Sequence, residues 1–310
     1  MRNVLLAYHD IGAVCLEELL ATGDEIALVI THEDPPGEEI WFRSVRALAE
    51  RQGIPVIAPR DVNAADVVER VTALAPDFLF SAMFRQMLKP ALLDAPRWGA
   101  LNLHPSLLPK FRGRAPINWV LVEGETETGV TLHYMVEKAD QGDIVAQLRI
   151  SIAADDTALT LHRKATDASR LLMREAYPLL AAGRAPRVAQ DSSLASYYGR
   201  RTPADGEIDW NRPAKRIYDL VRAVTHPYPG AFTWHQGRRL FIWLAHIADA
   251  PRPVAAGEVV VTRSGQVYVG AGQGALRLER VQPEGSPEST AGEWARGGGG
   301  CSGAVLGKLQ

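Results

Sequence analysis

The sequence predicts an α/β protein in which a mostly parallel β-sheet, with helices on both faces, is followed by a small β-barrel. Three observations support this prediction. The first part of the chain alternates short apolar runs with longer stretches of helical periodicity, the pattern of βαβ units. A polar, turn-rich segment, residues 184–208, then interrupts the alternation and is interpreted as a linker. After it come short strand-like runs punctuated by glycine and proline, which are typical of a small barrel.

The elements of the first domain follow from apolar runs bounded by turn residues. Buried strands are expected at Val4–Tyr8, Ile26–Ile30, Ile54–Ile57, Phe78–Phe84 and Ala100–Leu103. The helices between them are expected to include Leu16–Leu20, in a helix that ends near Gly23, and to cover Glu39–Gln52 and Ala65–Leu74. Two more strands and a long helix follow, at Thr128–Val136, Ile144–Ile150 and Thr157–Leu180. Because ligands bind at the carboxyl ends of parallel strands, the end of the fifth strand is a candidate site.

The second domain is predicted to begin with a helix at Ala214–Val224. Its strands are expected at Ala231–Trp234, Arg239–Leu244, Gly257–Val261, Gln266–Gly270 and Ala275–Val281.

Charge and cysteine content limit the possible partners and compartments. The 310 residues carry 34 basic and 36 acidic side chains, a net charge of −2. Even residues 201–310 hold only 13 Lys and Arg against 10 Asp and Glu, so no nucleic-acid partner is expected. Cys15 and Cys301 lie far apart, which argues against a disulfide framework and favours a reducing, cytoplasmic setting. No run approaches the roughly 18 apolar residues of a membrane span.

Three common cofactor and metal motifs are absent from the sequence. The first strand leads into AYHDIG, residues 7–12, rather than the GxGxxG turn of dinucleotide-binding enzymes. The phosphate-binding string GxxxxGK[ST] does not occur either. HExxH is missing, and the eight histidines show no ligand spacing along the chain, so no metal is expected.

The segment LNLHPSLLPKFRGRAP, residues 101–116, holds the first candidate catalytic residues. Asn102 and His104 are two apart at the end of a predicted strand, so their side chains point to the same face. An asparagine amide can donate to a developing oxyanion, and a histidine can transfer a proton near neutral pH. Taken singly, each residue is more often a cap, a turn or a packed side chain; the whole string favours catalysis.

A second candidate is Asp140, in the loop KADQGD that follows a predicted strand. A carboxylate beside a histidine favours the imidazolium and raises the pKa of that histidine. The competing interpretation of Asp140 is an Asx-turn that serves only the backbone. His133, inside the same strand, is predicted to be a packed histidine.

These strings resemble the folate-dependent formyltransferase family. The resemblance rests on NLHPSLLPKFRGRAP and ETGVTLHYMVEKADQGDIVAQ. It extends from YHD at residues 8–10 through THEDPPGE and ERQGIPVIAP to GRRTP and RAVTHPYPGAF, and fades after about residue 250. The string RGRAPINWVLVEGETETGVTLH is similar to the branch that formylates UDP-4-amino-4-deoxy-L-arabinose, a sugar of lipid A modification and polymyxin resistance.

The resemblance implies a Rossmann-like formyltransferase domain at residues 1–190 and an OB-like C-terminal domain at residues 204–305. It implies 10-formyltetrahydrofolate as the formyl donor, with no metal. In this family Asn102 would stabilise the transition state, His104 would donate a proton, and Asp140 would raise the pKa of His104.

The resemblance also implies which residues hold the folate. A loop and a segment would contact it mainly through the main chain, and one arginine through its side chain. These residues are a loop at Gln86, Met87 and Leu88, the side chain of Arg114, and the segment Val136, Glu137, Lys138, Ala139 and Asp140.

Two departures from the family pattern affect these expectations. Pro105 replaces the small residue that usually follows the histidine, and proline removes a backbone N–H. The chain to Gln310 has no counterpart of the NAD-dependent decarboxylase domain of the bifunctional relative, so a separate enzyme is expected to supply that step. A homo-oligomer is compatible with the sequence.

Several alternatives remain open at the level of sequence. The chain could formylate methionyl-tRNA, another UDP- or dTDP-linked amino sugar, or transfer the formyl group to water. A further alternative, from a different class, is a folate- or nucleotide-binding module without activity. The presence of Asn102, His104 and Asp140 together argues against it, because a binding module does not need these catalytic residue types.

Overall fold

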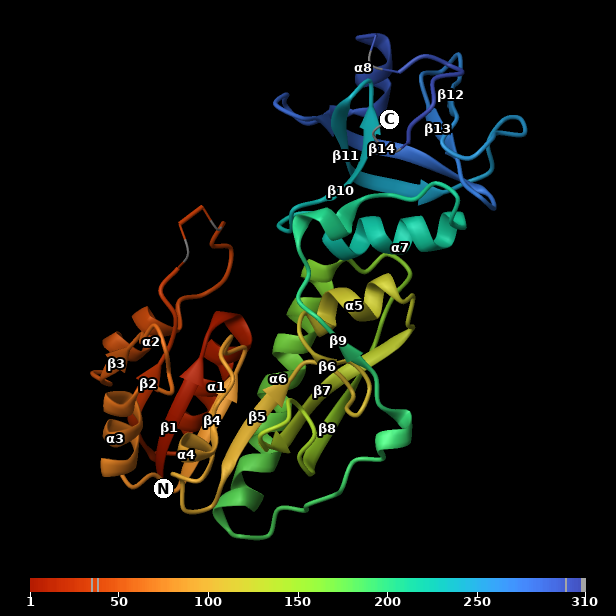
Figure 1. Ribbon diagram of the computed structural model, residues 1–310. Helices are drawn as coiled ribbons and strands as arrows, with labels where there is room; N and C mark the ends of the chain where they lie inside the picture. Colours follow the sequence, from red (N-terminus) through yellow and green to blue (C-terminus); the bar gives the residue numbers. More distant parts are fainter. Residues whose placement is uncertain (35, 38, 299, 308–310) are drawn as a thin grey trace. The chain divides into compact units, whose positions relative to one another are not determined.

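The computed structural model describes residues 1–34, 36–37, 39–298 and 300–307, and it divides into two compact units (Figure 1). The first unit comprises Met1–Pro116, Glu127–Ile152 and His162–Gly199. The second unit comprises Ile117–Thr126, Ala153–Leu161 and Arg200–Gln310. Two short stretches that precede residue 162 therefore belong to the second unit, which no pattern in the sequence indicates.

The first unit is built on one seven-stranded sheet in the order β3-β2-β1-β4-β5-β7-β8. Strands β1 to β5 pair in parallel, and β7 and β8 continue the sheet in antiparallel pairing. The bounds are β1 Arg2–Ala7, β2 Glu25–Ile30, β3 Val56–Ile57, β4 Phe78–Ala82, β5 Ala100–His104, β7 Glu127–Tyr134 and β8 Ile144–Ser151. Every one of these strands overlaps a strand predicted from the sequence, so the expected parallel-dominated α/β sheet is confirmed.

Helices cover both faces of this sheet. Val4 of β1 and Leu79 of β4 share one buried cluster with Val71 of α3. Neighbouring strand residues point to opposite faces, and Phe80 accordingly packs against Tyr177 of α6, with ring centroids 5.8 Å apart. The helices are α1 His9–Ala21, α2 Val45–Arg51, α3 Ala65–Ala73, α4 Pro90–Leu93 and α6 Ala158–Ala181.

Two sequence-based expectations for the first unit need correction. The helix expected at Glu39–Gln52 begins only at Val45, because Ser44 caps it by accepting a hydrogen bond from the amide of Ala47 at 3.2 Å. The presumed linker at residues 184–208 contains a short strand, β9 Tyr197–Tyr198, that pairs with β6 Arg112–Gly113. A two-residue strand is too short to produce a periodic pattern, so the sequence could not reveal it.

The second unit contains a six-stranded antiparallel sheet in which β15 joins the path β10-β11-β14-β13-β12 by pairing with β14. The bounds are β10 Ala231–His235, β11 Arg238–Ile247, β12 Val259–Val261, β13 Val267–Gly270, β14 Ala275–Pro283 and β15 Ser289–Thr290. Its helices are α5 Pro116–Val122, α7 Ala214–Val224 and α8 Ala291–Arg296. The bounds of α7 match the prediction; α5 and α8 were not predicted. No described helix is both long and apolar enough to span a membrane.

The chain after α8 bridges the two outer strands of this sheet. Trp234 on β10 exchanges two backbone hydrogen bonds with Gly307, at 3.0 and 3.1 Å. The amide of Val259 on β12 donates to the carbonyl of Ala304 at 2.8 Å. Residues 304–307 therefore connect the two ends of the sheet, as expected for the closed, barrel-like second domain.

Candidate active site

The candidate catalytic residues lie at the carboxyl end of β5, the last of the parallel strands, where the antiparallel strand β7 joins the sheet. Asn102 and His104 are on this strand, and β4 pairs with it on one side and β7 on the other. In the β5–β7 register Asn102 lies directly opposite His133. The antiparallel partner thus brings a second histidine to the same point, which the two strands taken separately do not show.

Asp140 reaches this strand end from the loop between β7 and β8. Its backbone has φ 55°, in the left-handed region that only a few non-glycine residues, aspartate among them, adopt. The loop is held from outside by Gln190, whose Nε2 donates to the carbonyl oxygens of Asp140 and Gly142 at 2.8 and 2.7 Å. Gly142 is required because a Cβ there would lie 1.9 Å from the carbonyl oxygen of Tyr134.

The structure brings together the three residues predicted to be catalytic. Asn102 Nδ2 donates to Asp140 Oδ1 at 3.3 Å, and His104 Nδ1 lies 3.6 Å from the same oxygen. His133 Nε2 is 3.5 Å from Asp140 Oδ1 and 3.2 Å from Asn102 Nδ2. The other carboxylate oxygen, Oδ2, accepts the amide of Gly113 at 2.8 Å. One carboxylate therefore organises an amide and two imidazoles.

Asp140 is ionised in this environment. Burial alone would raise the pKa of its carboxyl group, but the charge of His104, the hydrogen bond and charge of His133 and the Gly113 amide outweigh that effect. The pKa of Asp140 is consequently held well below its ordinary value. A fixed negative charge stands beside the candidate acid at neutral pH.

His104 is held by acceptors on both sides of its ring. Nε2 lies 2.8 Å from the carbonyl oxygen of Phe111, and Nδ1 faces Asp140. A doubly protonated ring can donate to both partners at once, whereas a neutral ring leaves one nitrogen without a hydrogen to give. Ser106 fixes the same turn, since its Oγ donates to the carbonyl oxygen of Lys110 at 2.8 Å. The arrangement suits a proton donor.

The loop predicted to hold folate is fastened to the neighbouring chain by its side chains. The amide of Val62 donates to Gln86 Oε1 at 2.8 Å, and Asn63 Nδ2 donates to the carbonyl oxygen of Met87 at 2.9 Å. Leu88 is buried in the core, whereas the side chain of Met87 is 51% exposed. Gln86 and Leu88 thus hold the loop in its conformation. Of the three residues Gln86, Met87 and Leu88, Met87 is the one whose side chain faces solvent.

The remaining predicted folate residues lie on two other loops of the same unit. Arg114 follows β6, is exposed, and donates from Nη2 to the carbonyl oxygen of Arg85 at 3.2 Å. This bond joins it to the loop of Gln86. The segment Val136–Asp140 is the β7–β8 loop itself, and Val136 exposes 45% of its surface there. Its role toward folate stays a prediction.

Sequence reasoning missed three residues of this site. His133 is buried as predicted, yet it also faces Asp140. Gln190 Oε1 accepts hydrogen bonds from Arg112 Nε and Nη2 at 3.2 and 2.8 Å. Because the Nε2 of the same side chain donates to the Asp140 loop, Gln190 links β6 to that loop. Gly113 supplies a backbone amide. The sequence gives one signal for these residues, because Arg112 and Gly113 lie inside the segment 101–116 that holds Asn102 and His104. No sequence pattern indicates that Gln190 belongs to the site.

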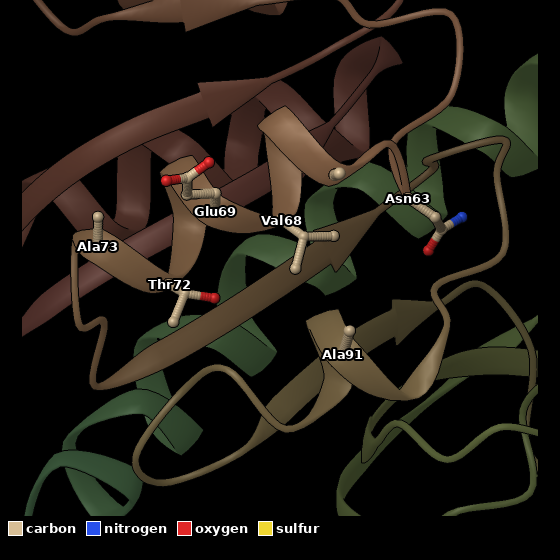
Figure 2. A pocket seen from close by; sticks show the side chains of 7 residues that line it. Asn63, Val68, Glu69, Thr72, Ala73 and Ala91 are labelled. Carbon is tan, nitrogen blue, oxygen red and sulfur yellow. The ribbon is translucent and has the colours of Figure 1, made fainter.

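A hollow elsewhere on the first unit contains none of these residues. It lies at α3 and α4 (Figure 2) and is lined by Asn63, Ala65, Val68, Glu69, Thr72, Ala73 and Ala91. Its polar side chains are Asn63, Glu69 and Thr72, and it has no histidine. Because it contains none of the clustered residues described above, the candidate active site is placed at the end of β5.

Two family models match the chain. A model described as formyl transferase matches residues 10–177. A second, described as formyl transferase, C-terminal domain, matches residues 200–299.

Solved structures share the fold over most of the chain. The N-formyltransferase from Helicobacter canadensis in complex with folinic acid and dTDP-3-aminofucose has a TM-score of 0.69 at 18% identity, covering 91% of this chain and 98% of that one. WlaRD, a sugar 3N-formyl transferase in the presence of dTDP and 5-N-formyl-THF, has a TM-score of 0.71 at 17% identity, with coverages of 93% and 99%.

HypX from Aquifex aeolicus is also similar, with a TM-score of 0.65 at 18% identity over 96% of this chain. The chain spans about half, 48%, of the length of HypX. At these identities the likeness establishes a shared fold, and the reaction must be argued from the site.

Proposed function

Because the chain belongs to the formyl transferase family, we propose that it transfers a formyl group from 10-formyltetrahydrofolate to the amino group of a nucleotide-linked sugar. The observation that carries this proposal is the cluster of Asn102, His104 and Asp140 at the carboxyl end of β5. The Helicobacter canadensis structure, which is in complex with folinic acid and dTDP-3-aminofucose, supports the choice of donor and acceptor classes.

The reaction exchanges one C–N bond for another. The unprotonated sugar amine attacks the formyl carbon, and the carbonyl oxygen becomes an oxyanion as the new C–N bond forms. The bond to N10 of the folate then breaks, and the carbonyl reforms. The amine gives up one proton and N10 takes up one, so the step needs a group that can donate a proton beside the leaving nitrogen.

In this proposal His104 supplies that proton. Its Nδ1 lies 3.6 Å from the Asp140 carboxylate, which orients the ring. A positioned general acid typically contributes about 10²–10⁴ in rate. Asp140 acts through His104 and Asn102 and is a positioning residue in this scheme.

Asn102 supplies the oxyanion donor. Its amide nitrogen has two hydrogens, and one is donated to Asp140 Oδ1 at 3.3 Å; the nitrogen also lies 3.2 Å from His133 Nε2. We assign the second hydrogen to the oxyanion, because the bond to the ionised Asp140 is charge-assisted and would be kept. One oxyanion donor is worth about 10²–10³ in turnover.

The finer assignments are part of the same proposal. We take UDP-4-amino-4-deoxy-L-arabinose as the acceptor, supported by the likeness of RGRAPINWVLVEGETETGVTLH to that branch. Residues 1–190 would carry the folate and catalytic sites, and residues 204–305 the second domain. The folate would contact Gln86–Leu88, Arg114 and Val136–Asp140. The cytoplasm, favoured by the two free cysteines, would be the compartment.

An acceptor panel tests this proposal. Purified protein is incubated with 10-formyltetrahydrofolate and, in separate reactions, UDP-4-amino-4-deoxy-L-arabinose, other UDP- and dTDP-amino sugars, and initiator methionyl-tRNA. Mass spectrometry then reads the formyl addition. We expect formylation of the UDP-linked arabinose, and formylation slower by about 10²–10³-fold with an Asn102→Ala variant. Formylation of methionyl-tRNA alone, or donor hydrolysis with no formylated acceptor, would overturn it.

A further inference from the structure

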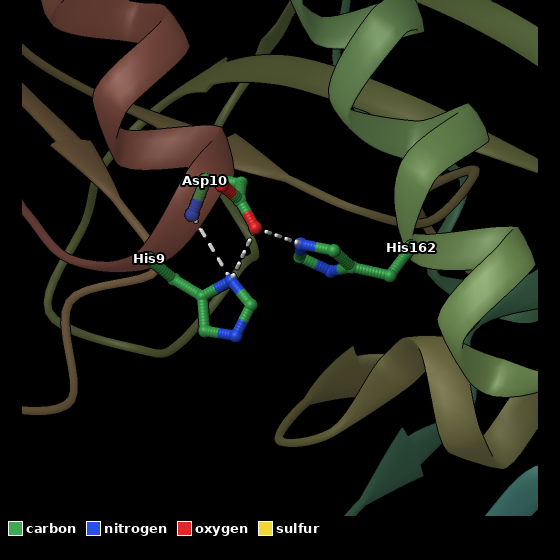
Figure 3. A group of neighbouring side chains, drawn as sticks. All are labelled: His9, Asp10 and His162. Atoms are coloured by element: carbon green, nitrogen blue, oxygen red, sulfur yellow. Dashed lines mark hydrogen bonds and ion pairs between the residues drawn. The ribbon is translucent and has the colours of Figure 1, made fainter. Parts of the chain in front are cut away.

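A second cluster of polar side chains lies at the start of α1 and is not used by the formyl transfer. It consists of His9 and Asp10, at the junction of β1 and α1, and His162 on α6 (Figure 3). Their side chains are 8%, 19% and 2% exposed. Three potential metal ligands are therefore fixed side by side within the first unit, although Asp10 and His162 are 152 positions apart in the sequence.

The spacing of the ligand atoms matches that of a metal site. His9 Nδ1 is 3.6 Å from Asp10 Oδ2, and His162 Nε2 is 3.4 Å from the same oxygen. All three atoms lie within 4.8 Å of one another. Zinc binds nitrogen and oxygen at about 2.0–2.2 Å in a tetrahedral arrangement, which places neighbouring ligands about 3.4 Å apart. One ion can reach all three atoms with small ring rotations.

The hydrogen bonds show which ring nitrogen carries a lone pair. The amide of Asp10 donates to His9 Nδ1 at 3.0 Å, so this nitrogen is an acceptor. It also lies 3.6 Å from Asp10 Oδ2, a second acceptor, and a bound metal ion would take over its lone pair from the amide. Two acceptors in contact repel each other, and a cation bound between them would turn that repulsion into attraction.

His162 presents its Nε2 to two oxygens. One is Asp10 Oδ2, and the other is Thr166 Oγ1 at 3.4 Å, whose own hydrogen is donated to the backbone carbonyl of His162 at 2.9 Å. Nε2 therefore carries a hydrogen toward these acceptors, and a metal ion would replace it. A histidine nitrogen that binds a metal ion generally releases its hydrogen when it does so.

The surroundings fix the ligands as an outer shell does in known metal sites. Asp10 Oδ1 accepts from both the amide and Nε of Arg43, at 3.2 Å each, which leaves Oδ2 for the cluster. Arg43 is itself neutralised by Glu17, 2.7 Å away. The ring of His9 stacks on Phe42 at 3.8 Å, and Trp41 closes the edge. Outer contacts of this kind orient ligands and strengthen binding.

We propose that His9 Nδ1, Asp10 Oδ2 and His162 Nε2 form a binding site for a divalent transition-metal ion of the zinc class. Two imidazoles and one carboxylate are a ligand set suited to Zn²⁺, Co²⁺ or Fe²⁺ rather than Mg²⁺ or Ca²⁺. Three protein ligands leave a fourth position for water or another oxygen donor. This departs from the expectation of no metal, which considered only spacing along the sequence.

Metal titration of the whole, tag-free chain tests this site without using the formyl-transfer reaction. The protein is treated with a chelator, exchanged into metal-free buffer and titrated with Co²⁺, whose visible absorption reports coordination by nitrogen and oxygen. Zn²⁺ is then added to displace Co²⁺. We expect one equivalent of Co²⁺ per chain, displacement by Zn²⁺, and no displacement by Mg²⁺.

Variants identify the ligands. His162→Ala and His9→Ala should each weaken Co²⁺ binding by about 100-fold or more, since even outer-shell changes cost roughly 10–100-fold. His246→Ala, at an exposed histidine of the second unit, is the matched control and should bind as the parent does. Asp10→Asn provides a further variant, with circular dichroism to confirm folding. Absence of one-equivalent binding, or binding unchanged in folded His9 and His162 variants, would overturn the proposal.

Discussion

Gln190 fastens the loop that carries Asp140, and replacing it separates catalysis from stability. Its Nε2 donates to the carbonyls of Asp140 and Gly142, and its Oε1 accepts twice from Arg112. Gln190→Glu keeps the acceptor that faces Arg112 and places an oxygen against the two carbonyls. The loop loses both of its donors while the link to Arg112 becomes an ion pair.

The structure sets the expected magnitudes. Each lost bond to a neutral carbonyl is worth about 0.5–1.5 kcal/mol, and a bond to a charged group about 1.5–3 kcal/mol. Gln190→Glu loses the two bonds to the neutral carbonyls of Asp140 and Gly142, but it strengthens the contact with Arg112. Its free energy of unfolding should therefore stay within about 1 kcal/mol of the parent. Gln190→Ala loses all four bonds of a half-buried side chain and should cost about 2–4 kcal/mol, because water replaces part of them.

Catalysis should respond differently from stability. A released loop lets Asp140 move away from His104 and Asn102, and a displacement of about 1 Å can cost about 10² in kcat. Both Gln190 variants should therefore lose kcat to a similar extent, despite their different stabilities. KM for the acceptor should change less.

Steady-state formyl transfer and urea unfolding measure the two effects. Gln282→Glu is the matched control, since Gln282 also holds a turn carbonyl, that of Ser286 at 2.8 Å, but lies in the second unit. It should leave kcat unchanged. A Gln190→Glu variant with the parent kcat, or a kcat loss that merely follows stability across the series, would refute the positioning role.

Three further outcomes follow from the site. Asn102→Ala should lower kcat by about 10²–10³ and His104→Ala by about 10²–10⁴ with unfolding midpoints close to the parent, and near-parent turnover in either variant contradicts its assigned role. Asp140 has a folded-state pKa below its ordinary value of 3.8, so its charge contributes stability above about pH 4 that is lost as the pH falls further. The unfolding free energies of the parent and Asp140→Asn should converge in acid, and a constant difference across pH argues against this. Gly142→Ala should displace the loop, since its Cβ would lie 1.9 Å from the Tyr134 carbonyl oxygen, and a kcat equal to the parent value would show that the loop adapts.

Much of the fold follows from periodicity. The helix predicted around Ala214–Val224 is observed as α7 over the same residues. All strands of the two large sheets except β15 are predicted, because apolar runs between turn residues are a strong local signal. Short elements were missed, as α5 and β9 show, because their positions depend on contacts with distant chain rather than on local pattern.

The site was predictable only in part, for a related reason. Asn102 and His104 could be paired from strand alternation alone. The contact between Asn102 and His133 depends on the antiparallel register of β5 with β7, and Gln190 reaches the site by returning from the far end of α6. No single-sequence pattern encodes either relation.

The bridging segment at residues 304–307 has a consequence for solubility. A free outer strand presents unpaired N–H and C=O groups that can recruit a strand from another molecule. Here Gly307 satisfies Trp234 on β10, and Ala304 satisfies Val259 on β12, so a few residues shield both outer strands at once. Removing residue 304 and the residues after it would leave β10 and β12 with unpaired backbone groups. We expect self-association through these two strands to be the first measurable effect of the truncation.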